Sequence, residues 1–149
     1  MGNDIPGRVA VDLLSIPPLI FRIIRSELVN TAMADYEIRL PHIEIMNVLK
    51  EGGTLHVAKI GERLRIAKAR MTHLIDKLVK LEMVERDVDT NDRRTINITI
   101  TDKGRTILEK HQRTITLAVR EYISGLEENE LETLSTSLRN IRDILFKLQ

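Results

Sequence analysis

Cysteine and tryptophan are absent from this sequence, and aromatic residues of every kind are scarce. Without cysteine, the chain can form no disulfide framework and has no thiolate nucleophile or thiol-based redox sensor. Aromatic side chains make up 3% of the 149 residues, too few for the stacking surface on which single-stranded nucleic acids bind. The composition therefore argues against thiol chemistry and against single-strand binding.

Motifs for metal binding and catalysis are also missing. The four histidines are scattered, without an HExxH motif or a paired spacing; they are His42, His56, His73 and His111. There is no Gly-rich phosphate loop and no Gly-x-Ser-x-Gly elbow. Glu127 and Glu128 fall at a predicted helix start, where the helix dipole favours acids for a structural reason. We expect no metal site, no cofactor and no enzymatic activity.

Long hydrophobic runs are lacking as well. The longest uncharged N-terminal run, residues 13–21, contains Pro17-Pro18 and is too short to span a bilayer. Charged residues interrupt the approach to the signal-cleavage-like triplet at residues 32–34. We therefore expect a cytoplasmic protein that does not enter the membrane.

The residues that are present suit a soluble globular protein, most simply a single domain over residues 1–149. The net charge of +1 hides an uneven distribution of charge along the chain. Residues 63–80 hold six basic residues against one acid, whereas residues 121–132 hold five glutamates and no base. We expect one basic region and one acidic region in the folded molecule.

The spacing of apolar residues and of helix-breaking residues predicts helices along most of the chain. In chain order these are a helix that begins after Pro17-Pro18, one from Pro41 to a stop at Gly52-Gly53, then helices over 55–64, roughly 67–81 and about 102–125. A last helix carries the leucines and the isoleucine between residues 131 and 148.

A β-hairpin is predicted within VERDVDTNDRRTINITIT, residues 84–101. Isoleucines at 96, 98 and 100 alternate with polar residues, as in a strand with one buried face. The polar turn between the strands holds Asp92, Arg93 and Arg94. A hairpin requires only turn-forming residues at its tip, so the two adjacent arginines need another explanation.

Two short helices joined by residues 65–67 and followed by a hairpin form a winged helix-turn-helix. The helix over 67–81 has an apolar stripe, made of Met71, Leu74, Ile75 and Leu78. Its other side offers hydrogen-bonding and cationic groups, as a helix in a DNA major groove needs, although many solvated surface helices look alike.

The arginines of the hairpin tip favour DNA, because a projecting basic tip can enter the adjacent minor groove. In the alternative interpretation, one arginine pairs with Asp89 or Asp92 and braces the turn.

The last helix carries an a/d seam with steps of three and four residues: Leu131, Leu134, Leu138, Ile141, Leu145 and Leu148. From periodicity alone, a core helix of one chain and a seam between two chains explain this pattern equally well.

The segment from residue 55 to residue 104 resembles the winged helix of the MarR family of bacterial and archaeal transcription regulators. The wing of that family has an Asp-x-Arg, then a strand and a Leu/Ile-Thr-x-x-Gly leading into the next helix. Here the corresponding residues are Asp92, Arg94, Ile100, Thr101 and Gly104. The helices before and after also match in number and order, so the resemblance covers nearly the whole chain.

The resemblance implies a mainly α fold with a small β-hairpin wing (α+β), in which the winged helix-turn-helix covers about 38–101. Dimerisation helices at about 9–35 and 102–149 would interleave in a homodimer, which favours the intermolecular interpretation of the seam. The implied function is a sequence-specific, ligand-responsive repressor that binds double-stranded DNA at a near-palindromic operator. A small anionic or phenolic effector is expected between the dimer helices and the DNA-binding lobe.

Carried over by position, the residues that face DNA are Lys68, Ala69, Arg70, Thr72, His73 and Lys77. In the wing, Asp92 is expected to hold the turn, Arg94 to enter the minor groove and Arg93 to contact phosphate. A winged helix that binds an acidic protein partner is the alternative function.

The sequence departs from the family pattern at three positions. Ala67 replaces the usual serine cap of the recognition helix and gives up roughly 1 kcal/mol of capping. Arg65 stands where a turn glycine is usual, so either the turn is rebuilt or a left-handed conformation is accepted. Ala69 supplies no hydrogen bond, although its methyl group can meet a thymine methyl.

Overall fold

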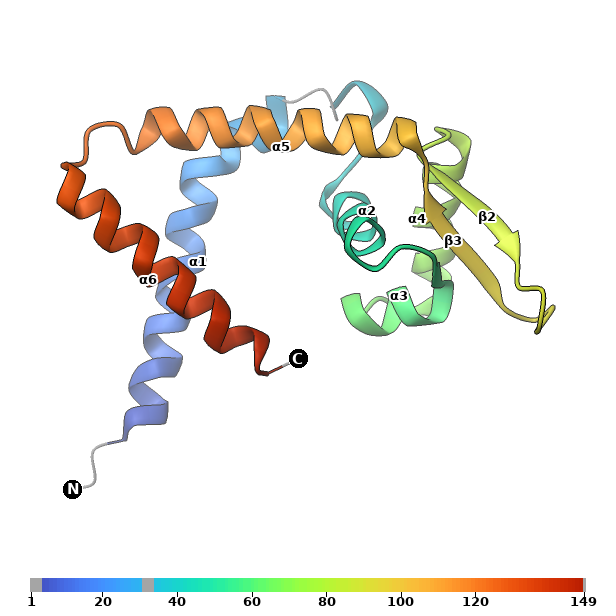
Figure 1. Cartoon of the computed structure of the whole chain (residues 1–149), viewed down its shortest axis with the longest axis horizontal. Coiled ribbons are helices and arrows are strands. Elements are labelled where there is room, and N and C mark those ends of the chain that lie inside the picture. The colour runs from blue at the N-terminus through green and yellow to red at the C-terminus, as the bar shows by residue number, and fades with distance from the viewer. Residues whose placement is uncertain (1–3, 31–33, 149) are drawn as a thin grey trace. The chain divides into compact units, whose positions relative to one another are not determined.

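The computed structural model describes residues 4–30 and 34–148, which form a mostly helical chain with one small antiparallel sheet (Figure 1). The elements are α1 (Ile5–Asn30), η1 (Ala34–Tyr36), α2 (Leu40–Gly52), β1 (Leu55–His56), α3 (Val57–Leu64), α4 (Lys68–Lys80), β2 (Val84–Val88), β3 (Ile96–Ile100), α5 (Asp102–Tyr122) and α6 (Glu128–Phe146). The predicted class, mainly α with a β-hairpin wing, is confirmed.

The chain divides into two compact units. The central unit comprises residues 25–115 and the terminal unit comprises residues 1–24 together with 116–149. α1 and α5 each contribute residues to both units. The single domain over residues 1–149 stays a prediction, as do the boundaries of its winged helix-turn-helix near 38 and 101.

The sheet of the central unit has the strand order β1-β3-β2, with both pairs antiparallel. β2 and β3 pair from Val84↔Ile100 to Val88↔Ile96, and β1 adds Leu55↔Ile98. Ile98 and Ile100 are buried, as the alternation predicts. The helix expected over 55–64 starts only at Val57, because Leu55 and His56 pair with β3 instead.

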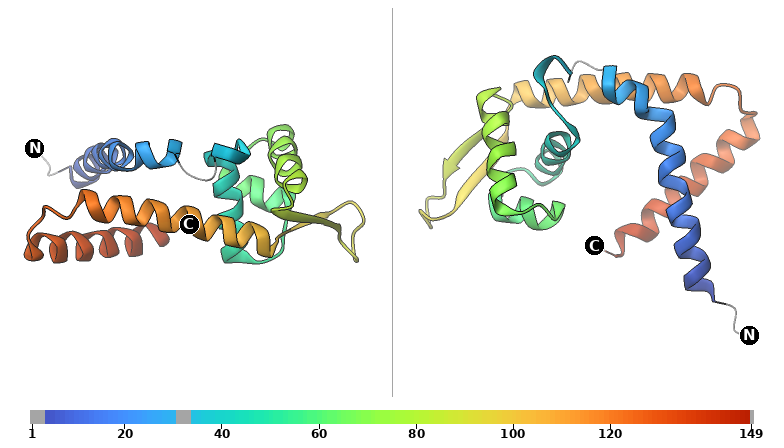
Figure 2. Two further views of the ribbon diagram at one scale, coloured as in Figure 1. Left: turned by 90° about the horizontal axis from the view of Figure 1, so that it is seen from above. Right: turned by 180° about the vertical axis from the view of Figure 1, so that it is seen from behind.

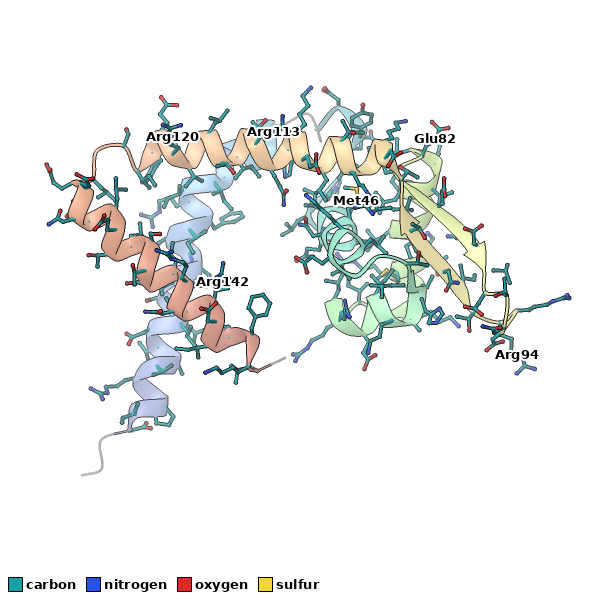
Figure 3. The ribbon with its side chains drawn as sticks, viewed as in Figure 1. Met46, Glu82, Arg94, Arg113, Arg120 and Arg142 are labelled. Carbon is teal, nitrogen blue, oxygen red and sulfur yellow. The ribbon has the colours of Figure 1, made fainter. Side chains whose placement is uncertain are left out.

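The core of the central unit lies where α2, α3 and α4 meet the sheet and the first turns of α5. Its fully buried members include Ile45, Met46, Leu49, Ile60, Met71, Ile75, Leu78, Ile98 and Leu108. Met46, labelled in Figure 3, is one of the α2 residues in this set. Three helices therefore share one apolar face of the hairpin, and the wing is the part that extends beyond them (Figure 2).

α1 begins at Ile5 and continues through Pro17 and Pro18, so the prediction that it starts after the two prolines is wrong. Proline has no N–H group, so the helical bonds to the carbonyls of Leu13 and Leu14 cannot form. Apolar residues before the prolines, among them Ile5, Val9 and Leu13, keep helical spacing. The apolar spacing on both sides of the prolines therefore continues the helix through them, despite the lost hydrogen bonds.

The wing is joined to α5 by the Ile-Thr-x-x-Gly motif. The Thr101 hydroxyl donates to the Glu82 carbonyl oxygen at 2.7 Å and accepts from the Gly104 N–H at 3.0 Å. A Cβ atom at Gly104 would lie 2.1 Å from the Met83 carbonyl oxygen, so only glycine fits without a shift. The motif therefore caps α5 and lets its first turn approach the start of β2.

Candidate nucleic-acid interface

α4 separates an apolar face from a polar one, as its sequence predicts. Met71, Ile75 and Leu78 are buried in the core. The polar face leaves five of the predicted DNA-facing residues exposed, namely Lys68, Ala69, Arg70, Thr72 and His73. Thr72 donates its hydroxyl to the Lys68 carbonyl oxygen at 3.1 Å, a local bond that DNA can replace. The exposed face thus offers donors and cations from a helix that the core holds in place.

The start of α4 lacks a side-chain cap. Ala67 occupies the N-cap position in an extended conformation. It forms no capping hydrogen bond, because its methyl side chain has no acceptor atom. Preceding it, Arg65 adopts φ 53° and ψ 42°, so the left-handed alternative predicted for this turn is the one adopted.

Lys77 differs from the other residues predicted to face DNA. Its Nζ lies 3.1 Å from Oε2 of Glu37, and its side chain is only about one third exposed. Glu37 follows η1, forty positions earlier in the chain. A contact between Lys77 and DNA stays a prediction, and such a contact competes with this ion pair.

Two aspartates organise the tip of the wing. Oδ1 of Asp89 accepts the N–H groups of Asn91 and Asp92, at 2.8 and 3.1 Å, and its Oδ2 accepts the Asn97 amide at 3.1 Å. These bonds, the one from the Asn91 N–H foremost, hold the pKa of Asp89 below its usual value. Asp92 accepts the Arg94 N–H at 3.0 Å and the Thr95 hydroxyl at 3.2 Å. Both carboxylates thus shape the turn through the backbone.

The side chains of Arg93 and Arg94 form no hydrogen bond or ion pair with any residue that the structure describes. The alternative in which one of them pairs with Asp89 or Asp92 is therefore wrong for this structure, since both carboxylates accept from backbone, amide or hydroxyl groups and from neither guanidinium. Figure 3 shows Arg94 at the tip of the hairpin. The wing presents two guanidinium groups that are available to a partner.

An ion pair that the sequence reasoning missed joins the wing to α4. Nη2 of Arg86 on β2 contacts Oδ1 of Asp76 on α4. Opposite charges ten positions apart on a helix and the following strand are the only signal in the sequence, and many such pairs never meet. The contact links β2 of the hairpin to α4.

Between α3, α4 and the hairpin lies a cavity of about 730 Å³. Apolar residues, among them Val57, Ile66 and Ile96, form part of its lining. Four cationic side chains also line it: Arg65, Lys68, Arg86 and Arg94. The predicted recognition helix and wing therefore border one open, basic cavity.

Two of the histidines are buried, His42 on α2 and His111 on α5. The N–H of Arg39 donates to Nδ1 of His42 at 3.2 Å, which requires this nitrogen to be unprotonated. Burial lowers the pKa of both imidazoles. Among the described side chains, those of residues 4–25 and 35–148, no three histidine or acidic groups gather in a way that could hold a metal ion.

All the predicted dimer residues except Leu148 lie on α6, which buries none of its side chains, and Leu148 lies just after the end of that helix. Leu131 and Ile141 are half-buried, whereas Leu134, Leu138, Leu145 and Leu148 are exposed, Leu148 to 78%. A core helix of a single chain would bury this seam, so that interpretation does not fit the described chain.

No described helix is both long and apolar enough to cross a membrane.

The family model described as "MarR family" matches residues 38–96. The HTH-type transcriptional regulator YwaE of Bacillus subtilis is 27% identical over 122 residues, which cover 82% of this chain and 71% of YwaE. The HTH-type transcriptional repressor MdtR of the same organism is 30% identical over 87 residues, which cover 58% of this chain and 56% of MdtR.

Among solved structures, Streptococcus pneumoniae FabT in complex with DNA has the same fold. Its TM-score is 0.66 at 23% identity, and the match covers 96% of this chain and 99% of FabT.

Proposed function

Through residues 38–96 the chain belongs to the MarR family of transcription regulators, and from this premise we propose how it binds DNA. α4 enters the major groove of double-stranded DNA with its exposed face, and the β2–β3 wing enters the adjacent minor groove. Lys68, Arg70, Thr72 and His73 contact the major groove, Arg94 the minor groove and Arg93 a phosphate.

The observation that carries this proposal is the state of the wing tip. Asp89 and Asp92 hold its backbone, while Arg93 and Arg94 have no partner in the described chain. A braced tip with two unpaired arginines costs little to order on binding, and arginine is the side chain most often inserted into narrow minor grooves. Asp92 therefore braces the wing, and the arginines reach the DNA.

A second copy of this chain is the proposed partner of the terminal unit. The α6 seam and the apolar residues of α1, including Leu14 at 76% exposure, present more apolar surface than one chain covers. Two copies related by a twofold axis would bury these surfaces and place two α4 helices in half-sites one DNA turn apart, roughly 34–36 Å. The operator is then a near-palindrome.

A small anionic or phenolic effector is the proposed ligand that releases the protein from DNA. Such a ligand acts only if it binds the DNA-incompetent spacing of the two recognition helices better than the competent one. We place the protein in the cytoplasm and assign it no enzymatic activity; repression is the proposed outcome of occupying the operator.

Selection of bound duplexes from random DNA, followed by affinity measurements on the selected site, tests the proposal. A dimer that contacts six to ten phosphates should lose roughly 10³–10⁵-fold in affinity between 50 and 200 mM salt. Arg94→Ala should weaken binding to the selected site by about ten- to a hundredfold, because each arginine contact contributes about 1–3 kcal/mol.

Arg113→Ala is the matched control, since Arg113 is an exposed arginine on α5, away from the wing (Figure 3). No enriched duplex and no salt dependence would rule out the DNA function. Capture of an acidic protein in a complex that Arg94→Ala disrupts would then favour the protein-binding alternative.

A further inference from the structure

Arg65 lies in a backbone conformation that its own side chain disfavours. It follows the last residue of α3, with φ 53° and ψ 42°. Its N–H donates to the Glu62 carbonyl oxygen at 3.3 Å, and the next N–H, of Ile66, donates to the Gly61 carbonyl oxygen at 2.9 Å. This is the helix-ending geometry in which glycine is the usual residue, because a Cβ atom crowds the backbone there. The fold needs the left-handed turn, but it does not need an arginine.

Nothing in the described chain uses the Arg65 side chain. It is exposed, and its guanidinium forms no hydrogen bond or ion pair with the described side chains, those of residues 4–25 and 35–148. Its alkyl stem is not part of the core. Strain of this kind, retained without an internal contact to offset it, is characteristic of positions where the side chain serves a function.

Arg65 is one of the cations that line the 730 Å³ cavity between α3, α4 and the wing. Arg86 is neutralised there by Asp76, and the one acid of the lining, Glu62, has Lys59 at 3.5 Å. Three cations are left without a counter-charge in the described chain: Arg65, Lys68 and Arg94. They come from the turn, from the first residue of α4 and from the wing tip.

If the proposed function is correct, an anionic DNA backbone lies between α4 and the wing, next to this cavity. The major and minor grooves are separated by one sugar–phosphate backbone, so a helix in one groove and a wing in the next have that backbone between them. Residues of both elements line the cavity. Resting on the proposed function, we propose that Arg65 binds a phosphate of the strand that separates the two grooves.

A phosphate contact and a base contact have different consequences. Phosphate contacts set the position of a protein on DNA without reading its sequence, so removing one weakens every duplex alike. Each lost contact also lowers the slope of log affinity against log salt by about 0.9. A dimer carries two copies of Arg65, so its slope should fall by roughly 1.8.

The test compares Arg65→Gly, Arg65→Ala and Arg63→Ala in the full-length protein, with the selected operator and an unrelated duplex. Arg63 is the control, because it is an exposed arginine in the last turn of the same helix and does not line the cavity. Affinity is measured by fluorescence anisotropy across a salt series, and Tm by circular dichroism.

For Arg65→Gly we expect Tm to rise or hold, while affinity for both duplexes falls by about tenfold with the lower salt slope. Arg65→Ala should show the same loss of affinity without the gain in Tm. Arg63→Ala should bind as the wild type does.

Unchanged affinity and slope in Arg65→Gly would overturn the inference, as would a loss confined to the operator, which marks base reading. A loss in the glycine variant alone, absent from Arg65→Ala, would assign the effect to chain flexibility instead. A wild-type protein that binds no duplex at all refutes the proposed function itself, so the two failures are distinguishable.

Discussion

The central and terminal units use their apolar residues in opposite ways. Every buried apolar residue of the described chain belongs to the central unit, residues 25–115. In the terminal unit, Leu14, Leu117, Phe146 and Leu148 are each more than 60% exposed, and α6 buries nothing. The two units have similar helical patterns in sequence, yet only one of them is a complete fold.

The difference teaches where each unit obtains its stability. Burial of apolar surface is the main force that stabilises folded chains, and the central unit satisfies it alone. The terminal unit leaves its apolar residues exposed within one chain, so in the proposed dimer its free energy of folding depends on association. Destabilising substitutions in the central unit should therefore unfold the protein, whereas those in the terminal unit should dissociate the proposed dimer.

The largest effect is expected from placing charges on the α6 seam. Leu134→Glu combined with Leu138→Glu would bury four carboxylates in the proposed dimer, a cost that association cannot offset. Light scattering after gel filtration should report the mass of one chain. Operator affinity should fall by at least about a hundredfold, since the two half-sites are no longer linked.

Thr136→Glu provides the control, because Thr136 is an exposed residue of α6 outside the seam. A dimer mass retained by the doubly charged variant would contradict the assignment of the seam.

The next effect concerns the central unit alone. Gly104→Ala places a Cβ atom 2.1 Å from the Met83 carbonyl oxygen, so α5 must move away from the start of β2. We expect the free energy of unfolding in urea to fall by about 3 kcal/mol, as for overpacked sites. Gly125→Ala is a matched control because nothing lies within 4 Å of its added Cβ. Equal stability of the two variants would refute the close approach.

A smaller effect is expected from pH. Because burial lowers the pKa of His42 and His111 below 6.5, the unfolded chain takes up protons first as the pH falls. Stability is therefore complete above pH about 6.5 and is lost as the pH falls through the folded pKa, by at most about 1.4 kcal/mol per pH unit for each histidine.

Melting curves between pH 8 and pH 5 measure this loss of stability. His111→Leu should flatten the profile, whereas His73→Leu, at an exposed position on α4, should not. A Tm that is constant over this range would contradict the prediction.

The smallest effect on stability belongs to the wing, which projects beyond the core. Asp89→Ala removes the acceptor of three hydrogen bonds at the tip and should leave Tm nearly unchanged. Operator affinity should nevertheless drop several-fold, because the loosened tip must be ordered again on binding. Glu85→Ala controls for the charge, because Glu85 is an exposed acid on β2 outside the turn. Equal affinity of both variants would show that the brace is dispensable.

Local patterns predicted most of the fold correctly. The stripe of Met71, Ile75 and Leu78 and the alternation of Ile98 and Ile100 depend on repeats of 3.6 and 2 residues, which neighbours in the chain determine. The same holds for the cap by Thr101, which acts over three residues. The start of α1 is the exception, because Pro17 and Pro18 predict a helix boundary where the apolar spacing on both sides continues one helix.

By itself, then, the sequence determined the order of the elements, the basic recognition helix and the arginine-tipped wing. Only the tertiary structure decided which charges meet: Lys77 with Glu37, Arg86 with Asp76, and Arg93 and Arg94 with nothing in the described chain. The physical reason is the distance along the chain between the residues that interact. Periodicity arises between adjacent turns, whereas a charge pair forty residues apart exists only once the core has brought two elements together.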